Sequence, residues 1–98
     1  MNILKNLQFS EQKPSTLVVS NSERQMTIAI GLMDGQVLKK HLSFTPALIV
    51  ILKGSILIQM ERKTVIINEF DTFEISASMP HEVTGLEESI FLLIKDKV

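Results

Sequence analysis

Turn-forming clusters divide this chain at regular intervals, and their spacing limits the available folds more than any other feature. The clusters follow one another at roughly 8–12 residues, the spacing of an all-β sandwich or barrel. They fall at residues 20–23, 33–35, 43–46, 53–54, 61–63, 68–71, 76–80 and 84–88. The runs between them are rich in Ile, Val, Thr and Phe, which favour strands. We therefore predict an all-β chain with little helix.

Two of these runs indicate how the predicted strands are buried. Residues 25–32 alternate, so that Met26, Ile28, Ile30 and Leu32 share one face of a strand. Residues 47–52, ALIVIL, are apolar on both faces, and both faces then need cover. One face can line a barrel, whereas the other needs a second layer or a second subunit. The apolar surface that one layer cannot cover predicts a homodimer, formed through sheet faces or swapped edge strands.

The size and composition of the chain narrow its class. A length of 98 residues predicts one domain, 1–98, with a core over 25–98 and an N-terminal strand or arm over 1–24. Residues 1–9 fit either a short helix or an edge strand. A net charge of −1 and the absence of Trp and Tyr argue against nucleic-acid binding.

The length of the apolar runs and the absence of cysteine indicate the cellular compartment of the protein. The longest apolar run, at residues 47–52, is far shorter than a membrane-spanning helix, and residues 1–10 do not read as a signal peptide. Cysteine is absent, which fits a reducing compartment. We therefore expect a soluble cytoplasmic protein that does not bind membranes.

A second pattern joins glycines to a histidine. Gly35 is followed by five residues and then His41, Ser43 comes two positions later, Ala47 four positions after that, and Gly54 closes the pattern. This spacing resembles the first motif of the cupins, in which a glycine precedes His-x-His, a glutamate and a second glycine. Ser43 stands where cupins carry the second histidine, and Ala47 stands where they carry the glutamate.

The second cupin motif is matched less completely. Phe70 stands at its opening glycine, Asp71 at the acidic position of its first turn, His81 at its histidine, and Gly85 at its Asn. We expect Asp71 to hold backbone N–H groups in an Asx-type turn. The resemblance covers roughly residues 26–94 and implies a double-stranded β-helix, or jelly-roll, barrel. In that barrel Gly54 would sit in a tight hairpin between two strands.

The resemblance also implies where a site would lie. Cupin metal sites typically set three histidines and one glutamate around an ion such as Mn, Fe or Zn, and this chain keeps only His41 and His81. We expect these two histidines to face each other at one barrel end. Glu82 should point away from them, since neighbours on a strand face opposite sides. The expected ligand pocket comprises His41, Ser43, Ala47, Ile49, Ile51, Gln59 and His81.

Two functions follow from these residues. The first is a non-catalytic or sensory barrel that binds a small molecule, with no cofactor and no catalytic residue, because Ser43 and Ala47 are poor metal ligands. The alternative is a metal-dependent enzyme of dioxygenase, isomerase or decarboxylase type, in which His41 and His81 bind Zn, Mn, Fe or Ni. A third reading is a stand-alone relative of the sugar-sensing barrels of transcription regulators, although the chain carries no DNA-binding helices.

Overall fold

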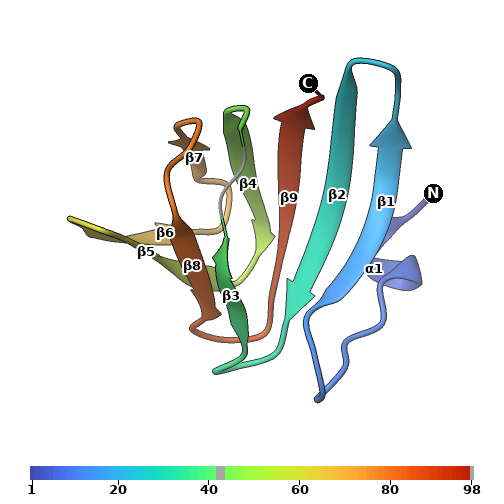
Figure 1. Cartoon of the computed structure of the whole chain (residues 1–98). Helices are drawn as coiled ribbons and strands as arrows, with labels where there is room; N and C mark the ends of the chain where they lie inside the picture. Colours follow the sequence, from blue (N-terminus) through green and yellow to red (C-terminus); the bar gives the residue numbers. More distant parts are fainter. Residues whose placement is uncertain (42–43, 98) are drawn as a thin grey trace.

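The chain forms two antiparallel β-sheets that face each other (Figure 1). The computed structural model describes residues 1–41 and 44–97, and for His41 it describes the backbone alone. Sheet A has the order β1 (Ser15–Asn21), β2 (Gln25–Leu32), β9 (Ser89–Asp96), β4 (Ala47–Lys53) and β7 (Thr72–Ile75). Sheet B has the order β3 (Val37–His41), β8 (His81–Gly85), β5 (Ser55–Met60) and β6 (Thr64–Asn68). The predicted all-β jelly-roll barrel is confirmed.

The inner faces of both sheets form one apolar core, because side chains alternate along each strand. In β4, Ala47, Ile49 and Ile51 point inward and are 8%, 1% and 0% exposed. Leu48 and Val50 point to the outer face of sheet A and are half-buried. The core residues of the two sheets are Ile30, Leu32, Ala47, Ile49, Ile51, Ile75, Phe91 and Leu93 from sheet A, and Ile56, Ile58, Ile67 and Val83 from sheet B.

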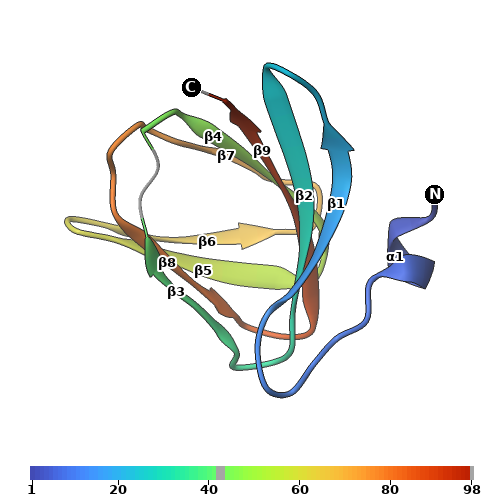
Figure 2. The same ribbon diagram turned by 45° about the vertical axis from the view of Figure 1, so that its right-hand side comes forward.

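The N-terminal segment covers part of the outer face of sheet A. Helix α1 (Ile3–Asn6) is a single turn, capped by Asn2, whose side-chain oxygen accepts a hydrogen bond from Lys5 N–H at 2.9 Å. Figure 2 shows α1 outside the barrel, beyond β1 and β2. Leu7 packs with Ala29 and Ile90 in a second buried cluster. Of the two alternatives for residues 1–9, the structure shows the helix. Among the described residues, no helix has the length and apolarity to cross a membrane.

Gly54 joins the two sheets rather than closing a hairpin. The strands end and begin around it as expected, at Lys53 and Ser55, but β4 belongs to sheet A and β5 to sheet B. The hairpin expected at Gly54 is therefore wrong. Its φ of +75° turns the chain sharply enough to pass from one sheet to the other in a single residue.

A buried serine binds the sheets together beside this corner. Ser89, at the start of β9, is 0% exposed, and its hydroxyl accepts a hydrogen bond from Ser55 N–H at 3.1 Å. The same hydroxyl lies 2.9 Å from the Ser55 carbonyl oxygen and 2.7 Å from the Glu87 carbonyl oxygen. Because Ser55 begins β5, these contacts connect sheet B to sheet A at what we call the lower end of the barrel.

Phe70 lies in a left-handed backbone conformation, with φ of +68°. Its side chain is 82% exposed, so packing does not explain the conformation. The sequence places Phe70 at the opening glycine of the second cupin motif, and the left-handed turn is retained although the glycine is not. A non-glycine residue in this region is strained by about 1–2 kcal/mol.

Replacing Phe70 with glycine is expected to raise the melting temperature by a few degrees. The left-handed strain is removed, and the greater freedom of glycine in the unfolded chain offsets part of a net gain of about 0.5–1 kcal/mol. Thermal unfolding followed by circular dichroism measures it. Phe70→Ala is the control, since it removes the exposed ring but keeps the strained Cβ. An equal rise in both variants would assign the gain to the ring.

Candidate functional site: the upper end of the barrel

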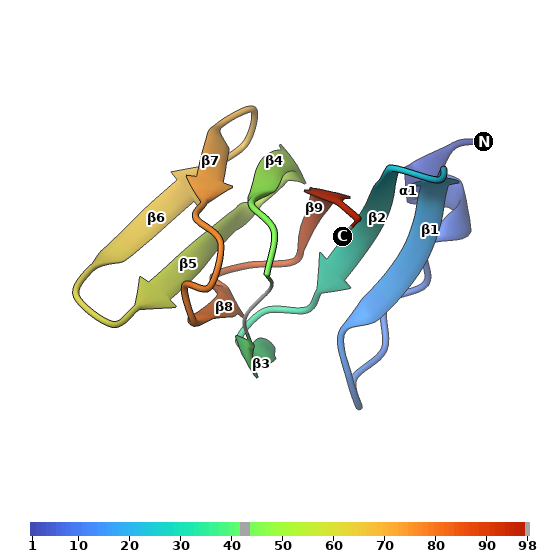
Figure 3. The ribbon, with the colours of Figure 1, turned by 45° about the horizontal axis from the view of Figure 1, so that its top comes forward.

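The chemistry-bearing residues gather at the end opposite Gly54 and Ser89, which we call the upper end. There β4 begins at Ala47, β7 ends at Ile75, β8 begins at His81 and β9 ends at Asp96. At this end the chain crosses between the sheets twice, from β3 of sheet B to β4 of sheet A and from β7 of sheet A to β8 of sheet B. In Figure 3, which brings the top of the molecule forward, the starts of β4 and β8 and the C-terminus lie around this rim.

Among the described side chains of this end, His81 is polar and buried. It is 4% exposed, and its Nδ1 lies 3.1 Å from the carbonyl oxygen of Met79. A carbonyl can only accept, so Nδ1 carries the proton and a neutral His81 presents an unprotonated Nε2. The backbone contact thus fixes the tautomer and the orientation of the ring.

The two histidines lie on neighbouring strands of one sheet. His41 on β3 is the register partner of His81 on β8, and His81 is in turn the partner of Met60 on β5. The sequence analysis expects the histidines to face each other at one barrel end, and in the structure β3 pairs directly with β8 in sheet B. The structure thus brings their backbones side by side. The remaining expected histidine position, Ser43, lies outside the described residues.

Ala47 stands on the facing sheet, where cupins carry their glutamate. Its register partners are Ile75 on β7 and Lys95 on β9. Below it on the same face of β4, Ile49 and Ile51 are fully enclosed by the core. These three positions therefore share the inner face, as the sequence predicts, with Ala47 nearest the rim.

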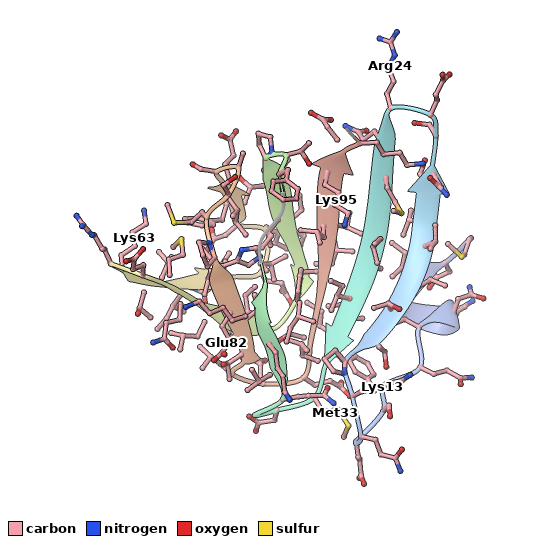
Figure 4. The ribbon with its side chains drawn as sticks, in the orientation of Figure 1. Lys13, Arg24, Met33, Lys63, Glu82 and Lys95 are labelled. Atoms are coloured by element: carbon pink, nitrogen blue, oxygen red, sulfur yellow. The ribbon has the colours of Figure 1, made fainter. Side chains whose placement is uncertain are left out.

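Gln59 lies on the outer face of sheet B, away from this group. It is exposed and is the register partner of Glu82, while its neighbours Ile58 and Met60 face the core. Gln59 and Glu82 share a surface hollow of about 400 Å³ (Figure 4 labels Glu82). The placement of Glu82 confirms its prediction. That of Gln59 corrects the expected pocket, because the two-residue period of the strand turns it outward.

A second hollow lies over the rim of sheet A. Its volume is about 450 Å³, and it is lined by Gln25, Pro46, Ala47, Leu48, Glu74, Ile75, Ser76, Ala77, Ile94 and Asp96. Half of these residues lie on the outer face of sheet A, and His81 is not among them. Asp71 lies elsewhere, in the turn before β7, and its Oδ2 accepts a hydrogen bond from Asn68 N–H at 2.8 Å. Asp71 therefore holds a backbone N–H as predicted, although that N–H lies three residues before it rather than after it as in an Asx-turn.

Lys95 is the residue of this end that sequence reasoning missed. It lies near the C-terminal end of β9 (Figure 4) and pairs with Ala47 on one side and Met26 on the other. It is half-buried, and it shares the inner face with Leu93 and Phe91. Within residues 1–41 and 44–97, no carboxylate forms an ion pair with it. Extending the alternation of β9 two residues beyond Leu93 would have found it.

Solved structures with this architecture include proteins identified as cupins. An RmlC-like cupin from Desulfovibrio desulfuricans matches with a TM-score of 0.89 at 20% identity, covering 98% of this chain and 93% of that one. A cupin superfamily protein from Desulfitobacterium hafniense matches with a TM-score of 0.86 at 19% identity, covering 93% and 84%. The chain has the cupin fold.

A third match has no assigned role. A conserved protein of unknown function from Streptococcus pyogenes has a TM-score of 0.87 at 20% identity, and the match covers 100% of this chain and 86% of that one. No family model matches the chain. No curated protein matches it either. The comparisons therefore establish the cupin fold, and the function has to be argued from the residues of this chain.

The described residues do not fit the metal site of a typical cupin. Ala47 offers a methyl group where a carboxylate would bind the ion, and Lys95 places a positive charge on the adjacent strand. A cation bound here would be repelled by Lys95 rather than neutralised by a carboxylate. Among the described residues, no group of three or more His, Cys, Asp and Glu side chains is placed to hold a metal ion.

Proposed function

We propose that this cupin is a non-catalytic barrel that binds a small molecule at its upper end, as a carrier or a sensor. The observation that carries the proposal is the pairing of Ala47 with Lys95, which replaces a metal-binding carboxylate with a methyl group beside a cation. Small-molecule sites are concave, largely apolar and oriented by a few polar groups. His81 and Lys95 are such groups, and Ile49 lies in the apolar layer below them.

The competing function is a metal-dependent enzyme of dioxygenase, isomerase or decarboxylase type. The observation in its favour is the register pairing of His41 with His81, since two imidazoles on adjacent strands are a common beginning of a metal site. A functional site of this kind would need further ligands, and the facing strand supplies none at Ala47. Metal affinity therefore separates the two functions.

Titration of the metal-free protein with Zn²⁺ or Mn²⁺ is expected to show only weak binding, with a dissociation constant above about 1 μM. Two imidazoles without a carboxylate form a poor site, and the charge on Lys95 weakens it further. Isothermal titration calorimetry measures the affinity. The variants His41→Ala and His81→Ala serve as controls, and little change from the parent is expected. Sub-micromolar binding by the parent, lost in either variant, would favour the enzyme.

We also infer that the barrel forms a homodimer through the outer face of sheet A. Leu48 on β4 is the register partner of Ile94 on β9, and Val50 is the partner of Leu92, so these four side chains form one apolar strip. All four are half-buried, and Leu52 extends the strip with 36% exposure. The cluster under the N-terminal segment centres on Ile90 and reaches Leu92, at one edge of the strip, and it does not include Leu48, Val50 or Ile94.

Charge at the two ends of the strip favours a second copy as its partner. Glu74, beside Leu48, marks the upper end, and Lys53 marks the lower end, where it packs over the ring of Phe9 at 5.8 Å. A two-fold axis across the strip would bring Glu74 of each copy toward Lys53 of the other. The apolar strip is self-complementary under such an axis, and Glu74 of one copy would add a second carboxylate to the Lys53–Glu88 ion pair of the other.

A further inference from the structure

The hollow over the rim of sheet A combines an apolar floor with two separated carboxylates. Its volume of about 450 Å³ is in the range of small-molecule sites, which join apolar surface to a few polar groups that orient the ligand. Leu48 and Ile94 form the floor from neighbouring strands, with Pro46 beside them. The polar residues of the lining are Gln25, Glu74, Ser76 and Asp96.

The two carboxylates lie at opposite corners of the hollow. Glu74 on β7 is the register partner of Leu48 on β4. Leu48 is in turn the partner of Ile94 on β9, and Asp96 follows two positions later on the same face. Two strand spacings across the sheet and two residues along β9 place the backbones of Glu74 and Asp96 about 12 Å apart. Figure 3 shows β7, β4 and β9 side by side in this order.

No described cation neutralises these two carboxylates. The ion pair found among the described residues lies at the lower end of the barrel. Lys95 is on the inner face of β9, Lys97 contacts the side chain of Asn21, and Arg24 extends upward from the turn between β1 and β2 (Figure 4). The described residues also supply no group of three or more metal-ligating side chains. The lining therefore suits an organic cation.

We propose that this hollow binds an aliphatic diamine, with one ammonium group beside Glu74, the other beside Asp96, and the hydrocarbon chain across Leu48 and Ile94. The hollow opens on the outer face, so the inference goes beyond the small-molecule site proposed within the barrel. Both carboxylates would repel an acid, and a monoamine could pair with only one of them. Because the two ammonium groups are linked, the second contact forms at a high effective concentration.

The diamine site overlaps the strip of the proposed dimer, since Leu48 and Ile94 belong to both. A two-fold axis across the strip would bring Lys53 of a second copy toward Glu74, where one ammonium group of the diamine would lie. The ligand and the second copy therefore compete, and each lowers the affinity for the other by the same factor. If the parent dimerises, saturating diamine is expected to increase the monomer fraction in sedimentation velocity. An unchanged fraction would place the diamine elsewhere.

The test compares hexamethylenediamine, hexylamine and hexanol, which share a six-carbon chain and carry two, one and no charges. Two-dimensional NMR titration of the isotope-labelled full chain at low ionic strength measures both the affinity and the location of each probe. We expect the diamine to bind about two- to five-fold more tightly than hexylamine, the scale of one exposed ion pair. The amide signals of Leu48, Ile75 and Ile94 should shift, and added salt should reduce the ratio of the two affinities.

Two variants test the two ends of the ligand. Glu74→Gln and Asp96→Asn each remove one charge while nearly preserving the shape of the side chain. Either variant should bind the diamine and hexylamine about equally, because one ammonium group has lost its partner. Glu82→Gln is the matched control, since it removes a charge from the outer face of sheet B (Figure 4). It should leave the ratio unchanged and so exclude a general effect of net charge.

Equal affinities of the parent for the diamine and hexylamine would overturn the inference, because at most one carboxylate would then contribute. A ratio that survives both Glu74→Gln and Asp96→Asn, or amide shifts confined to sheet B, would place the diamine outside the hollow. Absence of binding by all three probes, or hexanol binding as tight as that of the diamine, would reject an organic cation as the ligand. None of these results decides the proposed function, which the metal titration tests separately.

Discussion

Gly54→Ala is expected to destabilise the barrel by about 2–5 kcal/mol, a large share of the stability of a small domain. Two effects add at this position. The φ of +75° is unfavourable for any residue with a Cβ, and a Cβ here would lie 2.5 Å from the backbone oxygen of Glu88 and against the hydroxyl of Ser89. The backbone oxygen of Glu88 cannot move without disturbing the start of β9, so any relaxation of this clash is itself unfavourable.

Gly35→Ala provides the matched control for this result. Gly35 also has a positive φ, +81°, but a Cβ there would meet no atom within 4 Å. Gly35→Ala should therefore lower the free energy of unfolding only by the strain of the left-handed backbone, about 1–2 kcal/mol. Urea denaturation of the two variants gives both free energies of unfolding. Equal losses at the two glycines would show that the corner at Gly54 relaxes and that the clash contributes nothing.

Val50→Lys is expected to convert the proposed dimer into a monomer, with at least a hundred-fold increase in the dissociation constant. The substitution places a charge at the centre of the strip formed by Leu48, Val50, Leu92 and Ile94, in each of two copies, and burying two unpaired ammonium groups is strongly unfavourable. The barrel itself should remain folded, because Val50 faces outward. Sedimentation velocity over a concentration series measures the change.

Leu57→Lys is the matched control, since Leu57 is an equally half-buried residue on the outer face of sheet B. It should leave the dimer intact. If Leu57→Lys dissociates the dimer and Val50→Lys does not, the interface lies on the other sheet. A parent that sediments as a monomer at tens of micromolar would reject self-association altogether.

Features with a local cause could be predicted from the sequence. The alternation of Met26, Ile28, Ile30 and Leu32 depends on the period of a strand, and in the structure these residues face one side of β2. The contact between the Asp71 carboxylate and the backbone N–H of Asn68 spans three residues. The resemblance to the second cupin motif placed Phe70 at a glycine position, and its left-handed backbone agrees with that placement.

Features that depend on sheet partners could not be predicted. The strand ends around Gly54 were correct, but no local signal says that β4 and β5 belong to different sheets. The outward direction of Gln59 was readable from the alternation of Ile58 and Met60, and was overlooked. Lys95 was missed because the apolar run ends at Ile94, whereas its importance comes from Ala47, a residue 48 positions earlier in the chain that only strand pairing brings beside it.

The hydrogen bonds of Ser89 give the barrel a fixed hinge. At the lower end four connections join the sheets, at residues 33–36, 54, 69–71 and 86–88, together with the contacts of the buried hydroxyl with Ser55, whereas at the upper end the chain crosses only from β3 to β4 and from β7 to β8. We therefore expect opening motions to separate the two sheets at the upper end while the lower end stays closed. Amide hydrogen exchange should be slowest near Ser55 and fastest around Ile75. A ligand would then enter and leave through the upper rim while the lower end stays closed.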